Sequence, residues 1–150
     1  MSEITNNGEN KLDIVGFDAC LMSTIEVVEA VAPYSDIMIG SEILEPGDGW
    51  DYSFLQLLVD NPATTPEQLG AKIVDTFVAQ GQTAAESYAL TMLDMRMAEY
   101  TIDSINALAE LKDSTSLISD LEAIRPNSVH VEPGDSSSAV DLLHLLNSLS

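Results

Sequence analysis

The sequence predicts an α/β fold that contains a parallel sheet. Two short runs, Leu12–Phe17 and Ile37–Ile39, are apolar and rich in β-branched residues, as buried strands are. The segment 25–32 between them places its apolar residues on one helical face and its acidic residues on the other, and Pro33 follows it. A strand, a helix and a second strand in this order are typical of a parallel crossover.

The chain then continues with a loop, helices and a third strand. Residues 41–52 (SEILEPGDGWDY) are dense in Pro, Gly and Asp, which predicts a loop after the second strand. Thr65 and Pro66 have the residue types that begin helices, and Gly81 is the expected end of that helix. The other expected elements are a short helix over Ser53–Val59, a strand over Tyr88–Leu93, helices over Arg96–Leu111, Leu117–Ile124 and the apolar segment 139–150, and a flexible loop at about 125–138.

The chain length predicts one domain. Its 150 residues are enough for a core without disulfide bonds, and we expect residues 1–150 to form a single α/β domain or a fragment of a larger one. A buried strand so near Met1, and a last helix without a cap or polar tail, favour a natural chain that continues at both ends.

The charge balance excludes several classes of partner. There are 25 acidic and 5 basic residues, for a formal net charge of −20. Nucleic acid is not an expected partner, because phosphate backbones are bound by clustered Lys and Arg. We also expect no membrane association, since no apolar run approaches the roughly 20 residues of a membrane span. The surface should attract cations and basic peptides, although solubility or a salt-rich habitat would also explain its charge.

The single cysteine, Cys20, follows the first predicted strand and precedes the first helix. It cannot form an internal disulfide, and His130 and His144 are not at zinc-finger spacing from it. Backbone N–H groups at such a strand end favour the thiolate, which predicts a nucleophile. The alternative is an inert, buried small side chain.

The segments LDIVGFDACLMSTIEV and SEILEPGDGWDY closely resemble the clostripain-like cysteine peptidases. In that family the nucleophilic cysteine ends a parallel strand within a D-A-C-L-M segment. The resemblance covers Lys11 to about Leu111, and it implies a caspase-like αβα fold, incomplete in this chain. It also implies a bacterial and secreted protein, with calcium as a possible cofactor, although no D-x-D-x-D-G loop is present.

The resemblance assigns roles to three residues. Cys20 would be the nucleophile that forms a thioester with the substrate. Asp18 and Asp48 match acidic residues that line the primary specificity pocket of the family, which implies cleavage after Arg or Lys. The alternative for each aspartate is to hold a turn or cap a helix. Trp50 is expected to be a hydrophobic lid on the loop.

The sequence departs from the family pattern because no histidine precedes Cys20. The resemblance implies a catalytic histidine upstream of the cysteine, so we expect it in a preceding part of the protein or in a companion chain. His130 and His144 follow the cysteine and are interpreted as surface and helix-packing residues. This chain alone should therefore be inactive or nearly so. A non-catalytic acidic module that binds basic peptides, or a degenerate homologue, is the alternative.

Overall fold

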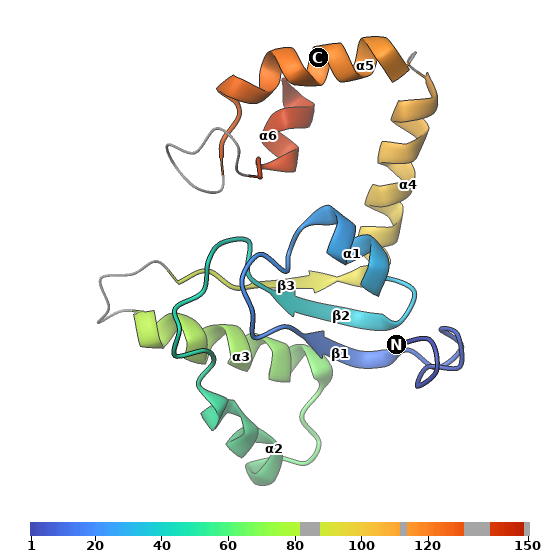
Figure 1. Ribbon diagram of the computed structural model, residues 1–150. Coiled ribbons are helices and arrows are strands. Elements are labelled where there is room, and N and C mark those ends of the chain that lie inside the picture. Colours follow the sequence, from blue (N-terminus) through green and yellow to red (C-terminus); the bar gives the residue numbers. More distant parts are fainter. Residues whose placement is uncertain (82–87, 112–113, 131–138, 149–150) are drawn as a thin grey trace. The chain divides into compact units, whose positions relative to one another are not determined.

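The computed structural model describes residues 1–81, 88–111, 114–130 and 139–148 (Figure 1). The chain divides into two compact units, Met1–Glu99 and Tyr100–Ser150. The elements are β1 (Leu12–Gly16), α1 (Ile25–Val31), β2 (Ser35–Gly40), η1 (Tyr52–Leu55), α2 (Gln56–Asp60), α3 (Pro66–Gly81), β3 (Thr91–Asp94), α4 (Met95–Leu111), α5 (Ser114–Ile124), η2 (Arg125–Asn127) and α6 (Leu142–Asn147).

The sheet of the first unit has the order β1-β2-β3. β1 and β2 are parallel, with Leu12 opposite Ser35 and Gly16 opposite Ile39, so the predicted parallel crossover through α1 is confirmed. β3 is antiparallel to β2. Among the described residues β1 pairs only with β2, so its other edge has no neighbouring strand.

Helices cover both faces of this sheet, with α1 on one side and α3 on the other (Figure 1). Ile37 and Ile39 point to the same face because side chains alternate along a strand, and they pack in one cluster with Ile73 and Phe77 of α3. Met38 points to the opposite face and is fully buried. Strand β2 is therefore the centre of the core, as its uninterrupted apolar run predicts.

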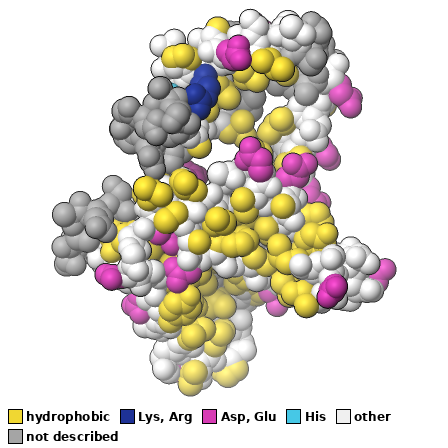
Figure 2. Space-filling view, in the orientation of Figure 1, with side chains coloured by type: hydrophobic (Ala, Val, Ile, Leu, Met, Phe, Trp, Pro, Cys, Tyr) yellow, Lys and Arg dark blue, Asp and Glu magenta, His cyan; other side chains and the backbone are white. Residues whose placement is uncertain are grey.

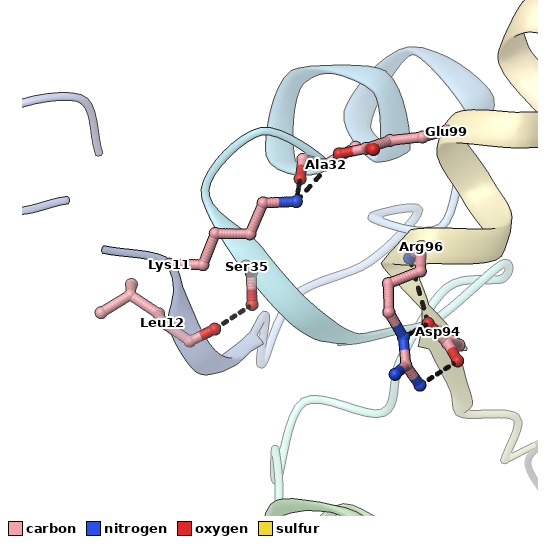
Figure 3. Close-up of polar contacts among 7 residues, drawn as sticks. All are labelled: Lys11, Leu12, Ala32, Ser35, Asp94, Arg96 and Glu99. Atoms are coloured by element: carbon pink, nitrogen blue, oxygen red, sulfur yellow. Dashed lines mark hydrogen bonds and ion pairs between the residues drawn. The ribbon is translucent and has the colours of Figure 1, made fainter. Parts of the chain in front are cut away.

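Polar contacts fix the ends of the strands (Figure 3). The Lys11 ammonium donates to the carbonyl of Ala32 at 2.9 Å and pairs with Glu99 at 2.9 Å, which joins the start of β1 to the end of α1 and to α4. The Ser35 hydroxyl donates to the Leu12 carbonyl at 3.2 Å. These contacts hold the two parallel strands in register where they begin.

Arg96 forms a two-pronged pair with Asp94 at the junction of β3 and α4 (Figure 3). The Arg96 guanidinium holds the pKa of Asp94 at about 2, chiefly through its side-chain hydrogen bonds. Both groups are exposed, so the pair contributes little to stability.

Several predicted elements differ in detail from the structure. The helix expected over Leu117–Ile124 begins at Ser114, and the one expected over 139–150 is Leu142–Asn147, with Val140 in a β-bridge before it. The strand expected over Tyr88–Leu93 is Thr91–Asp94, because its partner β2 ends at Gly40, which lies opposite Thr91. Tyr88 instead packs its ring against Phe77, with centroids 5.0 Å apart. The helix expected over Ser53–Val59 is divided into η1 and α2.

The second unit contains most of α4, together with α5, η2 and α6. His130 and Val140 form an isolated antiparallel bridge, and His144 is exposed on α6. Most of the predicted loop at about 125–138 lies outside the described residues, and its first part is the 3₁₀ helix η2. No helix in the described ranges has the length and apolar character needed to cross a membrane.

We predict that Phe77→Ala lowers the free energy of unfolding by about 3–5 kcal/mol, because Phe77 is fully buried and the substitution leaves a cavity. Val78→Ala is the matched control on the same helix, since Val78 is exposed and should change stability by less than about 1 kcal/mol. Urea denaturation measures both values. Equal effects would show that α3 does not pack through Phe77.

Candidate active site

The site is built where the loops that follow β1 and β2 run side by side. Hydrogen bonding between the two segments continues beyond the strands. Phe17 N–H donates to the Ile39 carbonyl at 2.9 Å, and farther along Leu21 N–H donates to the Ile43 carbonyl at 3.2 Å. Parallel pairing therefore brings both loops together at the carboxyl ends of β1 and β2, which is where α/β folds place their sites.

Cys20 lies in the first of these loops and is half-buried. Its Sγ accepts a hydrogen bond from the backbone N–H of Glu45 at 3.3 Å, and the thiol lies 3.8 Å from the Glu45 carbonyl oxygen. Leu21, the next residue, has a left-handed backbone with a φ of 60°, which turns the chain sharply after the thiol. The helix α1 begins only at Ile25. The backbone N–H that donates to Cys20 Sγ belongs to Glu45, in the loop that follows β2.

Asp18 joins the two loops through its side chain. Its Oδ1 accepts from the Trp50 backbone N–H at 3.0 Å and its Oδ2 accepts from the Tyr52 hydroxyl at 2.9 Å. Gly49 has a φ of +66°, and a Cβ there would lie 3.0 Å from both Asp18 oxygens, so this approach requires glycine. Asp18 therefore holds a turn while its side chain remains exposed.

Asp48 is exposed in the loop that Asp18 holds. Its neighbours form a tight turn, in which Gly49 N–H donates to the Pro46 carbonyl at 3.2 Å. The far end of this loop is anchored to α3, because Asp51 N–H donates to Gln80 Oε1 at 3.1 Å. The structure thus brings the Asp48 loop next to the Cys20 loop, without a hydrogen bond between Asp48 and either Cys20 or Asp18 in the described residues.

Trp50 belongs to the hydrophobic core, and the interpretation as a lid on the loop is wrong. Its side chain is 8% exposed and packs in one cluster with Phe54 and the isoleucines of β2. A Cβ at Gly16 would lie 2.9 Å from the Trp50 ring, so glycine on β1 makes room for the indole. Trp50 therefore fixes the second loop against the sheet.

Glu45 is a residue of the site that the sequence did not single out. Both of its carboxylate oxygens are out of contact with solvent and have no hydrogen-bond partner among the described residues, and the same is true of the Trp50 indole nitrogen. Burial raises the pKa of Glu45, a hydrogen-bonding interaction with the Trp50 indole that falls outside ordinary hydrogen-bond geometry lowers it in part, and the charge of Asp18 raises it further. The sequence indicates only that Glu45 belongs to the Pro- and Gly-rich loop. It does not indicate burial, because composition does not show which polar side chains of a loop turn inward.

The acidic residues of the site also affect the pKa of Tyr52. Its hydrogen bond to Asp18 raises the pKa of Tyr52, with smaller contributions from burial and from the charges of Asp18 and Glu45. No group of three or more His, Cys, Asp or Glu side chains in the described part of the chain is arranged to hold a metal ion.

A family profile decides the relationship of this chain. The profile of the clostripain family, a family of C11 peptidases, matches residues 1–149. The chain belongs to the clostripain family. The caspase-like α/β fold is confirmed by C11 protease structures that superpose on nearly the whole chain. Membership of the family relates the chain to the C11 cysteine proteases.

Three solved structures illustrate this likeness. A clostripain from Bacteroides thetaiotaomicron in complex with the peptide inhibitor BTN-VLTK-AOMK has a TM-score of 0.66 and 16% identity, over 98% of this chain and 61% of the other. An inactive zymogen C11 protease from Parabacteroides distasonis has a TM-score of 0.64 and 19% identity, over 97% and 40%. A secreted C11 cysteine protease from Bacteroides thetaiotaomicron, in complex with an irreversible peptide inhibitor, has a TM-score of 0.62 and 20% identity, over 93% and 39%.

These proteins establish the fold that the clostripain family shares. This chain spans only 39–61% of their lengths. No curated protein matched the sequence.

We predict that Glu45→Gln raises the free energy of unfolding near neutral pH. The folded state raises the pKa of Glu45 above 4.5, so ionising this carboxyl costs the folded state more than the unfolded state. The contribution of protonated Glu45 to stability should therefore be lost as the pH rises through 4.5 and on through the raised value, and the advantage of the variant should vanish well below 4.5.

Urea denaturation at neutral and at acidic pH measures this difference. Glu42→Gln is the matched control, because Glu42 is exposed in the same loop. A Glu45 variant that is less stable than the parent at neutral pH would contradict the prediction, since it would reveal a favourable partner for the carboxylate.

Proposed function

We propose that the complete protein is a cysteine endopeptidase that cleaves after Arg or Lys, with Cys20 as its nucleophile and with Asp18 and Asp48 in its primary specificity pocket. The observation that carries this proposal is the pairing of the two loops. Cys20 and Asp18 leave the end of β1 together, and Asp18 hydrogen-bonds the loop that contains Asp48. Membership of the clostripain family supports the chemistry.

In the proposed reaction the Cys20 thiolate attacks the carbonyl carbon of the scissile bond. The tetrahedral intermediate then expels the amine, which takes up a proton, and leaves a thioester on Cys20. Water adds to the thioester and releases the carboxylic acid and the free thiol. The backbone N–H of Cys20 is our candidate for one donor to the oxyanion.

The general base of this reaction is proposed to be a histidine upstream of the chain. The described histidines lie in the second unit, on the bridge to Val140 and on α6, and we assign neither of them to the reaction. The histidine would come from a preceding part of the protein or from a companion chain. The likeness to a secreted protease supports the further proposal that the complete protein acts outside the cell.

Charge supports the preference for basic residues. Residues 12–71 contain no Lys or Arg, so neither loop of the site carries a positive side chain. Acidic side chains lie at several places on the face of the first unit drawn in Figure 2. A pocket with two carboxylates favours a cationic side chain, and arginine gains most because it can bind a carboxylate through two parallel hydrogen bonds. The peptide inhibitor bound by one relative ends its VLTK sequence in lysine, which is consistent with this preference.

We predict that Cys20→Ala in the complete protein lowers kcat for a lysine-containing peptide by at least about 10⁴-fold, because the thioester can no longer form. The unfolding transition should stay close to that of the parent, since Cys20 is only half-buried. Hydrolysis assays and urea denaturation measure the two properties. Turnover by the variant would exclude Cys20 as the nucleophile, and peptide binding without turnover by the parent protein would favour the non-catalytic module.

We predict that Asp48→Ala lowers kcat/KM about 10- to 100-fold for a peptide cleaved after lysine, and leaves a matched leucine peptide nearly unchanged. The side chain is exposed, so its removal should not disturb the loop. Asp75→Ala, which removes an equal charge from the exposed surface of α3, is the control. A similar loss with both peptides would assign Asp48 a structural role in the loop.

A further inference from the structure

Glu45 contacts the candidate nucleophile through its backbone, and the two carboxylate oxygens of this half-buried residue are removed from solvent. Its N–H donates to Cys20 Sγ at 3.3 Å. Its two carboxylate oxygens are removed from solvent and have no hydrogen-bond partner among the described residues. A carboxylate in such a position is costly, and proteins retain buried charges mainly where a partner compensates them.

The surroundings of Glu45 are negative or neutral. The groups that act on its carboxyl are the Trp50 indole and Asp18, and no lysine or arginine is among them. Two cations of the described residues pair with other carboxylates: Lys11 pairs with Glu99, and Arg96 pairs with Asp94. No lysine or arginine is thus among the groups that affect the pKa of Glu45, and a bound ligand is a source of the cation that would compensate its charge.

The neighbouring aspartate is already occupied by the protein. Asp18 uses one oxygen to accept from Trp50 N–H and the other to accept from the Tyr52 hydroxyl. Part of its capacity to bind a substrate cation is therefore committed to holding the loop. The Glu45 carboxylate interacts only with the Trp50 indole among the groups that affect its pKa in a favourable direction, and its charge is weakly screened because water is excluded from its oxygens.

We propose that Glu45 is a third acidic determinant of the primary specificity pocket, and that its charge is compensated by the Lys or Arg side chain of the bound peptide. This inference rests on the proposed peptidase function. The cation favours the ionised form of Glu45, and the attraction acts across the poorly screened site without requiring the substrate to touch the carboxylate. Glu45 thereby adds to substrate binding and takes no part in the bond-breaking steps.

The test compares two peptides that differ in one side chain, lysine or the uncharged norleucine, before the scissile bond. In the complete protein, Glu45→Gln should lower the ratio of kcat/KM for lysine over norleucine by about tenfold or more, mostly through KM for the lysine peptide. Glu42→Gln should leave the ratio unchanged, because Glu42 is exposed to solvent. Glu45→Asp keeps the charge and should restore part of the lost preference.

Each alternative outcome has its own meaning. An unchanged lysine preference in Glu45→Gln, or an equal loss with both peptides, overturns the role of Glu45 while the proposed function stands. The second result would indicate that Glu45 supports the loop or pairs with another part of the protein. If the parent protein shows no Cys20-dependent hydrolysis or no lysine preference, the proposed function itself fails and this inference fails with it.

Discussion

The parallel pairing of β1 with β2 is the interaction on which the rest of the site depends. It sets Gly16 opposite Ile39, and hydrogen bonds between the two chain segments continue beyond that point to Leu21 and Ile43. Two loops that are separate in the sequence are thereby held at one edge of the sheet. A shift in this register would move Cys20 away from Glu45 and Asp18 away from Trp50, so the chemistry of the site follows from the geometry of the sheet.

The second loop keeps its position because polar and apolar contacts act on it together. Asp18 holds its backbone from the β1 side, and Gln80 of α3 holds it at Asp51. Between these two anchors the Trp50 ring lies buried in the core beside Gly16. Two glycines permit this arrangement, because Gly16 leaves room for the indole and Gly49 adopts a backbone that L side chains rarely adopt. The exposed acidic residues of the loop are thus carried by a rigid support.

The sequence predicts what depends on local pattern and misses what depends on packing. Apolar periodicity was sufficient for β1, α1 and β2, and the residues around Cys20 were sufficient for the family. The start of β3 could not be predicted, because it is decided by where β2 ends. The burial of the Trp50 ring and of the Glu45 carboxylate oxygens cannot be predicted for a common reason: in a loop rich in Pro, Gly and Asp, nothing local shows which side chains turn inward.

The edge of β1 that has no neighbour among the described residues has a consequence for the handling of this polypeptide. Its backbone N–H and C=O groups form a template that another strand can extend, and the net charge of −20 is what opposes contact between identical copies. Salt screens that repulsion within a Debye length of about 8 Å at physiological ionic strength. Self-association of this chain should therefore be governed by ionic strength, and low-salt buffers are the conditions in which it remains dispersed.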